Sequence, residues 1–165
     1  MIISSLTGPL KTGERGRVLA LDVGKKRIGL AVSDELGITA QGLDTLERVR
    51  IREDLDRLKA TAERLDARLL LVGRPMHMSG SESRQGEYTR EFAERLAKHV
   101  SLPVVFWDER LTSAEAERLM REGGATLEQR KKAVDRMAAV LLLDSYLENQ
   151  RLQKRVEQVD EDTLE

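Results

Sequence analysis

The chain of 165 residues is 40% hydrophobic and 35% charged, which suits one globular domain with a proper core and is too short for two lobes of ordinary size. Its formal net charge of −1 excludes a general electrostatic attraction to nucleic acid, so any such binding must rest on a local basic patch. The absence of cysteine excludes disulfides and thiolate chemistry, and with no apolar run of the roughly 18–20 residues that span a bilayer and no secretion signal, we expect a cytoplasmic protein.

The first half of the chain predicts a β-hairpin, a third strand and an amphipathic helix. The hairpin strands are the apolar runs 18–23 and 28–33, joined by a tight turn over 24–26, and the third strand is expected over 38–46. From Ile51 to Leu65, apolar residues recur at spacings of four and three with charged residues between them. This pattern is typical of a helix that covers a sheet.

The second half predicts strands that alternate with helices. The unbroken apolar run 69–72 is typical of a central strand, and after a loop over 75–86 a helix is expected over 87–99, followed by a strand over 104–107. Thr112 and Glu115 have the spacing of a capping box, and the helix that they begin is expected to end at Gly123. A last helix is expected from Leu127 or Arg130 to Asn149.

This order of elements predicts an α/β domain in which helices flank a mixed five-stranded sheet of three antiparallel strands followed by parallel strands. We expect the domain to span residues 17–150. The stretches 1–16 and 151–165 lack an apolar pattern and are expected to be flexible tails.

Three acidic residues stand at positions where an ordinary core has none. Asp22 lies within the run 18–23, Glu109 follows the run 104–107, and Asp135 shares a helix face with Ala139 and Leu142. An ionised carboxylate in apolar surroundings costs several kcal/mol unless it has a partner. With no cysteine and two histidines in the chain, the carboxylates favour one or two Mg²⁺ or Mn²⁺ ions over zinc.

Each acidic residue also has a simpler explanation. Asp22 could end its strand and bond the backbone of the turn. Because strand side chains alternate, at most one of Asp108 and Glu109 can face the site. Glu109 is the first choice and Asp108 an alternate ligand, and the simpler explanation is a charged strand end that pairs with Arg110. Asp135 could form an ion pair with Lys131, four residues earlier on the helix.

Four segments of the sequence resemble the YqgF/RuvX family. They are the opening signature over 21–34, a glycine- and proline-containing loop over 72–80, the Asp-Glu-Arg motif at 108–110 and the last helix from 132 to 146. The segments occur in the family's order within 18–147. Arg74 departs from the family by replacing an apolar residue, and His77 stands where an amide is common.

The resemblance implies an RNase H-like fold and a divalent-metal nuclease, with Asp22, Glu109 and Asp135 at the family's acidic positions. It implies trimming of the 5′ end of precursor 16S ribosomal RNA in ribosome biogenesis or cutting of Holliday junctions in DNA recombination, and the sequence does not choose between them. Junction cutting implies a homodimer, whereas RNA trimming can be done by a monomer.

Basic residues near the acidic positions are candidates for contacts with the phosphate backbone. Those expected to bind substrate are Lys26, Arg27, His77, Arg110 and Lys131. Gly24 and Gly29 would allow close approach of the backbone, although a positive φ in the turn over 24–26 is the simpler expectation for Gly24.

Two other classes of function are compatible with parts of the sequence. Actin-like ATPases also open with Asp-x-Gly and a hairpin, but they need a second unit for which this chain has neither the length nor the repeat. A non-catalytic RNA-binding module would gain nothing from acidic groups that face phosphates.

Overall fold

The computed structural model describes residues 2–3, 16–75, 79, 83–108, 123–124 and 126–164. Side chains are not described for 2–3, 127–128, 130–136 and 164. The strands are β1 (Ile2–Ile3), β2 (Arg17–Val23), β3 (Arg27–Ser33), β4 (Ala40–Gly42), β5 (Leu46–Glu47), β6 (Ala67–Arg74) and β7 (Val104–Asp108). The helices are α1 (Ile51–Arg64), α2 (Arg84–His99) and α4 (Leu127–Leu164).

The strands form one mixed sheet in the order β1-β7-β6-β2-β3-β4, and β5 also pairs with β3. The predicted hairpin is confirmed, because β2 and β3 are antiparallel and Leu21 lies opposite Leu30. β6 and β7 then add in parallel to β2, after the crossover helices α1 and α2. The central strand β2 therefore ends at the same edge of the sheet as β6 and β7.

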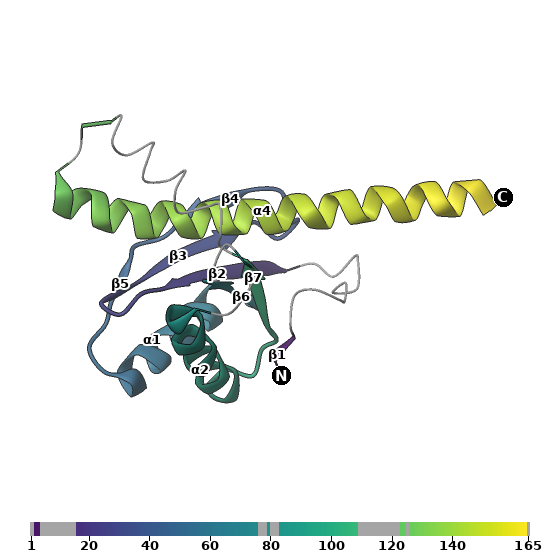
Figure 1. The fold of residues 1–165 in the computed structure, drawn as a ribbon. Coiled ribbons are helices and arrows are strands. Elements are labelled where there is room, and N and C mark those ends of the chain that lie inside the picture. The colour runs from purple at the N-terminus through teal and green to yellow at the C-terminus, as the bar shows by residue number, and fades with distance from the viewer. Residues whose placement is uncertain are drawn as a thin grey trace.

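Helices cover both faces of the sheet (Figure 1). Alternate residues of the strands pack with α1 and α2 on one face, where Leu58 and Leu96 are buried. The other residues of the strands pack against α4, through Leu142, Leu143 and Tyr146. This division follows from the two-residue period of strand side chains, and it decides which face each polar residue near the strand ends can reach.

The sheet has more strands than the predicted five. The predicted third strand over 38–46 is divided into β4 and β5, because residues 43–45 leave the sheet between them. β1 adds parallel to β7 within the stretch 1–16, which was expected to be a tail. The predicted helix that starts at Thr112 lies outside the described residues.

Helix α4 continues to Leu164, beyond its predicted end at Asn149. Apolar residues that face the sheet stop at Leu147, which is why the pattern predicted an earlier end. The segment beyond it consists largely of Arg, Lys, Gln and Glu, which favour helix without burial, and has no Gly or Pro. Within the described residues, no helix has both the length and the apolar character needed to cross a bilayer.

Asp34 organises the loop between β3 and β4. One carboxylate oxygen accepts the backbone N–H groups of Ile38 and Thr39 at 2.7 and 2.9 Å. These hydrogen bonds, most of all the one from Thr39, hold the pKa of Asp34 below its ordinary value of 3.8, although desolvation of the carboxylate acts in the opposite direction. The charged form therefore stabilises the fold above the unfolded pKa, and this contribution is lost as pH falls through the lower folded pKa.

We expect Asp34→Asn to destabilise the protein by at most about 1 kcal/mol at neutral pH, since solvent screens this group. Urea unfolding at several pH values would measure the difference from the wild type. It should shrink as pH falls below 3.8, because the wild type then loses the same charge. A difference that grows toward low pH would contradict this role.

Candidate functional site

Asp22 lies near the carboxyl end of the central strand, on the face covered by α4. Its neighbours at two-residue spacing, Val18 and Ala20, pack with α4, whereas Leu19 and Leu21 pack with α1 and α2. The alternation therefore directs Asp22 toward α4. Asp22 is partly buried.

Glycines flank Asp22 on both neighbouring strands. Gly29 is its Cα partner on β3. On β6, Gly73 follows Val72, the partner of Leu21. By the same alternation both glycines belong to the α4 face, where neither places a side chain beside the carboxylate.

The end of β7 distinguishes the two candidates of the Asp-Glu pair. Val104 and Phe106 pack with α1 and α2, so Asp108, two residues further, belongs to that face and not to the face of Asp22. Its Cα partner on β6 is Arg74, which carries its guanidinium 5.8 Å from the Phe106 ring centroid. Glu109 lies outside the described residues.

The first turns of α4 carry Asp135 and Lys131. The backbone of both residues is helical, and their side chains are not described. Asp135 precedes Ala139 by four residues and Leu142 by seven, and both of these pack on the sheet. Asp135 therefore belongs to the side of the helix that faces the sheet.

Further along, α4 is fixed on the sheet by aromatic contacts. The Trp107 and Tyr146 rings meet edge to face with centroids 5.4 Å apart, and Trp107 Nε1 donates to Ser145 Oγ at 3.1 Å. Burial raises the pKa of the Tyr146 hydroxyl, although the positive charge of Arg68 acts to lower it. Tyr146 is thus a neutral part of the core at neutral pH.

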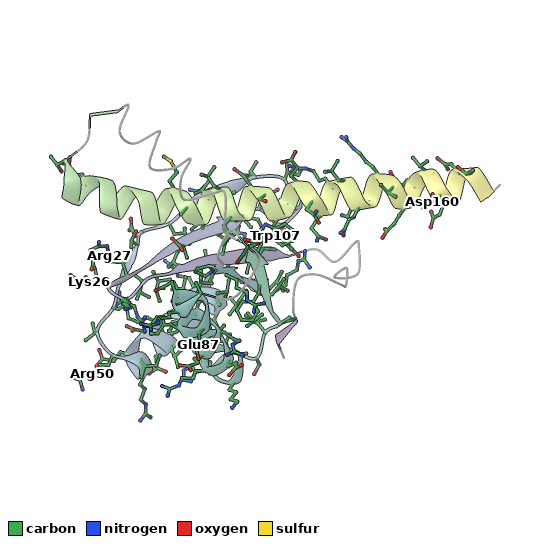
Figure 2. The ribbon with its side chains drawn as sticks, in the orientation of Figure 1. Lys26, Arg27, Arg50, Glu87, Trp107 and Asp160 are labelled. Atoms are coloured by element: carbon green, nitrogen blue, oxygen red, sulfur yellow. The ribbon has the colours of Figure 1, made fainter. Side chains whose placement is uncertain are left out.

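The predicted basic turn lies at the end of the β2–β3 hairpin. Figure 2 shows Lys26 and Arg27 at the periphery of the molecule, below the first turns of α4. Lys26 is exposed and Arg27 partly buried. The other two candidate substrate contacts of the loops, His77 and Arg110, lie outside the described residues.

Gly24 is required in this turn by close packing rather than by a positive φ, which corrects the prediction. Its φ is not in the left-handed region, but a Cβ at this position would lie 2.7 Å from the carbonyl oxygen of Arg27. The Gly24 N–H donates to that same oxygen at 2.8 Å. The turn is therefore tightly closed immediately after the strand that carries Asp22.

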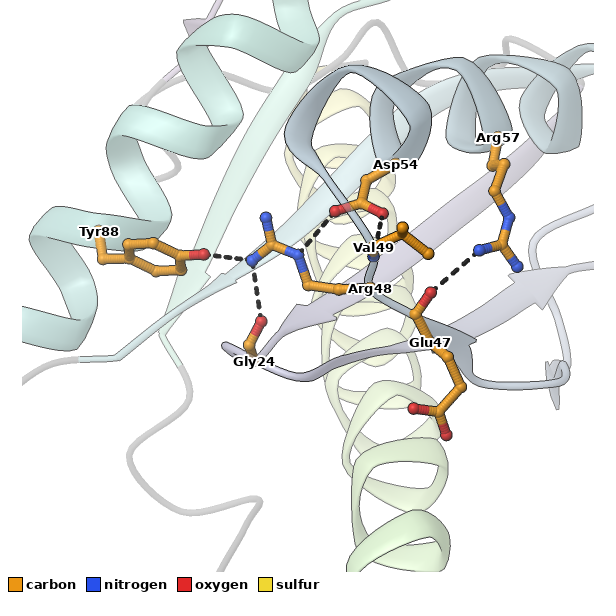
Figure 3. Close-up of polar contacts among 7 residues, drawn as sticks. All are labelled: Gly24, Glu47, Arg48, Val49, Asp54, Arg57 and Tyr88. Atoms are coloured by element: carbon orange, nitrogen blue, oxygen red, sulfur yellow. Dashed lines mark hydrogen bonds and ion pairs between the residues drawn. The ribbon is translucent and has the colours of Figure 1, made fainter.

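A largely buried arginine, which sequence reasoning missed, holds this turn on the body of the protein (Figure 3). Arg48 Nη1 donates to the Gly24 carbonyl oxygen at 3.1 Å and to the hydroxyl of Tyr88 on α2. Arg48 Nε meets Asp54 of α1 at 3.0 Å, and the side chains of Arg48 and Asp54 are 10% and 1% exposed. The Arg48 guanidinium also lies 4.9 Å from the Phe92 ring centroid. Arg48 thus joins the hairpin turn to both helices of the other face.

Two further hydrogen bonds complete the anchoring of the hairpin. Gln85 Nε2, at the start of α2, donates to the carbonyl oxygen of Val23 at 3.1 Å. The backbone N–H of Arg48 donates to the carbonyl oxygen of Lys26 at 2.9 Å. A cavity of about 270 Å³ beside Arg48, lined also by Ile51 and Phe92, lies on the α1 and α2 side of the sheet. It is on the face opposite Asp22.

Within the part of the chain that the structure describes, no three acidic or histidine side chains gather into a metal-binding group. Of the four predicted ligands, Asp22 and Asp108 have described side chains, and they belong to opposite faces of the sheet. The position of Asp22 still fits a divalent ion. It offers hard carboxylate oxygens, and it lies on the sheet face toward which the position of Asp135 on α4 is also turned.

Solved structures with the same fold define the class of this protein. The yeast mitochondrial Holliday junction resolvase Ydc2 superposes with a TM-score of 0.54 at 12% identity, covering 90% of this chain and 85% of that one. The fowlpox virus resolvase in complex with Holliday junction DNA gives a TM-score of 0.52 at 12% identity, covering 81% and 97%. The fold is the RNase H-like fold of these resolvases.

Sequence comparison is more specific. The profile of the RuvX family, described as Holliday junction resolvase, matches residues 16–149. A relative from Koribacter versatilis named "Putative pre-16S rRNA nuclease" is 50% identical over 139 residues, which are 84% of this chain and 91% of the relative. A relative from Clostridium novyi with the same name is 45% identical, covering 81% and 98%. The chain belongs to the RuvX family.

Proposed function

We propose that this protein is a divalent-metal-dependent nuclease that hydrolyses phosphodiester bonds in the 5′ region of precursor 16S ribosomal RNA, in the cytoplasm. The position of Asp22 carries the proposal. It is a partly buried carboxylate at the end of the central strand, with glycines on both sides, in a family whose close relatives are named for this RNA.

Asp22, Glu109 and Asp135 would hold one or two Mg²⁺ or Mn²⁺ ions, whereas Asp108 belongs to the opposite face of the sheet. Bound there, such ions supply activation of water and stabilisation of the leaving oxygen at phosphorus. Asp22 is suited to this role because its strand pairs with a neighbouring strand on each side. The carboxylate would therefore be held in place before substrate binds.

The basic residues would hold the phosphate backbone across this site. Lys26 and Arg27 sit on the turn that Arg48 fixes, and Lys131 is one turn before Asp135 on α4. Contacts of this kind position the strand without reading its bases. His77 and Arg110 would contribute from the segments that follow β6 and β7 in the sequence.

Cleavage of four-way DNA junctions is the second candidate. The description of the family and the fold neighbour solved with junction DNA favour it. Both candidates use the same carboxylates and differ in the shape of the nucleic acid that reaches them, so a direct comparison of substrates separates them.

The experiment offers the purified protein a precursor 16S fragment and a four-way DNA junction side by side, with Mg²⁺ or Mn²⁺ and with Asp22→Asn as the blank. We expect metal-dependent cleavage of the RNA, at least about tenfold faster than that of the junction, a difference of about 1.4 kcal/mol in activation free energy. Faster cleavage of the junction would establish the second candidate instead. Cleavage of neither substrate would refute the nuclease.

A further inference from the structure

The last part of α4 extends beyond the sheet as exposed helix. Figure 1 shows α4 crossing the sheet and projecting well past it to the C-terminal end. Arg151 donates to the Ile38 carbonyl oxygen at 3.1 Å, and every side chain from 151 to 163 is exposed. The family match ends at residue 149. This segment is therefore an addition to the part of the chain that matches the family.

Three large apolar residues are nevertheless exposed on this segment. Leu152, Val156 and Val159 are 52%, 61% and 63% exposed. Their spacings of four and three place them on one side of the helix, the pattern of a coiled-coil contact surface. We call these three residues the terminal face.

The terminal face does not point toward the protein's own sheet. At about 100° per residue, its centre is rotated by about 140° from the centre of the α4 surface that packs on the sheet, which is formed by Ala139, Leu142, Leu143, Tyr146 and Leu147. Because α4 is one continuous helix, the terminal face cannot be covered by the sheet that α4 already contacts.

The charges of the segment are divided along its length. Its first part is basic and contains Arg151, Lys154 and Arg155. Its second part is acidic and contains Glu157, Asp160, Glu161 and Asp162. The acidic part disfavours an anionic membrane or nucleic acid as the partner along the whole face. A second copy lying antiparallel would place each basic part beside an acidic part, whereas a parallel copy would place like charges level with each other.

We propose that the terminal face pairs with the same face of a second copy of this chain, in an antiparallel arrangement related by a twofold axis. With the axis between Val156 and Val159, Leu152 reaches the level of Thr163 of the second copy. Arg155 and Asp162 flank the apolar face on the same side, seven residues apart, so Arg155 of each copy faces Asp162 of the other. The contact is isologous and closes as a dimer.

Two physical features make a short contact sufficient for reversible pairing. An isolated helix of this length is marginal in water because nucleation is unfavourable, but here the helix is continuous with turns that are anchored on the sheet. The residues are thus ordered before the copies meet, which lowers the entropic cost of association. Three apolar residues a side bury little area, so the dimer should dissociate on dilution.

Sedimentation velocity of the full chain over about 1 µM to about 1 mM tests the proposal. The wild type should shift from monomer to dimer, and Val156→Asp should raise the dissociation constant more than about tenfold. Gln158→Asp is the matched control, since it puts the same residue in the same helix away from the terminal face and should leave dimerisation unchanged. A wild type that stays monomeric throughout, or equal effects of the two variants, would overturn the proposal.

Charge exchange tests the antiparallel geometry separately. Arg155→Asp alone and Asp162→Arg alone should each weaken the dimer, because each places like charges opposite one another, and the double variant should restore it. In a parallel pair Arg155 would instead lie near Asp160, so the double variant would not recover. Circular dichroism of each variant checks that the helix is retained, and failure of the double variant to recover with intact helix would reject the antiparallel pair.

Discussion

Replacing Asp22 with Asn should abolish cleavage while the protein remains folded. Asn has nearly the same shape as Asp, so the strand pairing of β2 with β3 and β6 stays intact, but the side chain loses its charge. Changing a residue that only orients a metal ligand costs about 10–100-fold in affinity or activity. Loss of a ligand itself should therefore reduce the rate by more than about 100-fold. We expect the same of Glu109→Gln and Asp135→Asn.

The rate of cleavage under single-turnover conditions, with the metal ion varied, measures this effect. Asp144→Asn is a suitable control, since it makes the same change at an exposed position of α4. Calorimetric titration with Mn²⁺ supplies a readout that does not depend on substrate, and binding should be strong in the wild type and weak in Asp22→Asn. Normal cleavage by all three acidic variants would show that the metal site is elsewhere.

Thermal unfolding without metal separates a catalytic role of Asp22 from a structural one. If the three carboxylates face one another, removing one charge relieves their repulsion, so the melting temperature of Asp22→Asn should equal or exceed that of the wild type. A clear fall in melting temperature would instead indicate that Asp22 is needed to bond the backbone of the hairpin turn.

The sequence predicted the elements whose patterns are local. The hairpin follows from two apolar runs around Gly24, and the crossover helices and parallel strands follow from the change between helical and strand periods. The position of Asp22 in its strand was sufficient to place it among apolar neighbours, and the sheet then determined which face it occupies. The acidic positions at 109 and 135 are still predictions.

Features that depend on contacts between distant segments were not predicted. Asp54 was not singled out from the charged residues between the apolar positions of α1, although its spacing of three from Ile51 and four from Leu58 places it on the buried side. The pattern gave a signal, but its meaning depends on Arg48, whose partner cannot be known before the loop, α1 and α2 are assembled. A polar residue on the apolar side of a helix should therefore be treated as a candidate for a buried pair.

Replacing Arg48 with Met should destabilise the protein by about 3–5 kcal/mol. Met retains an apolar stem but cannot balance the charge of Asp54, whose side chain is 1% exposed. Asp54 would still accept the Val49 N–H at 3.1 Å, but the carbonyl of Gly24 and the hydroxyl of Tyr88 would lose their shared donor. Breaking one half of a buried pair is costly because the remaining charge is left in surroundings of low polarity.

Arg50→Met provides the control on the same segment. Arg50 Nε lies 3.3 Å from Glu53, but the two side chains are 76% and 52% exposed, so this pair should contribute less than about 1 kcal/mol. Urea unfolding of both variants measures how much stability each loses relative to the wild type. The loss should be several-fold larger for Arg48→Met than for Arg50→Met. Similar small changes would show that Arg48 is not essential to the fold.

The double variant Arg48→Met, Asp54→Leu distinguishes a lost attraction from a stranded charge. If most of the cost of Arg48→Met comes from leaving Asp54 unbalanced, removing both charges should recover more than half of the lost stability, because no charge then remains buried. If the hydrogen bonds of Arg48 to the Gly24 turn dominate, the double variant should be at least as unstable as the single one. In either case the turn that carries Lys26 and Arg27 loses a tether, so weaker binding of nucleic acid should accompany the change even where the protein is fully folded.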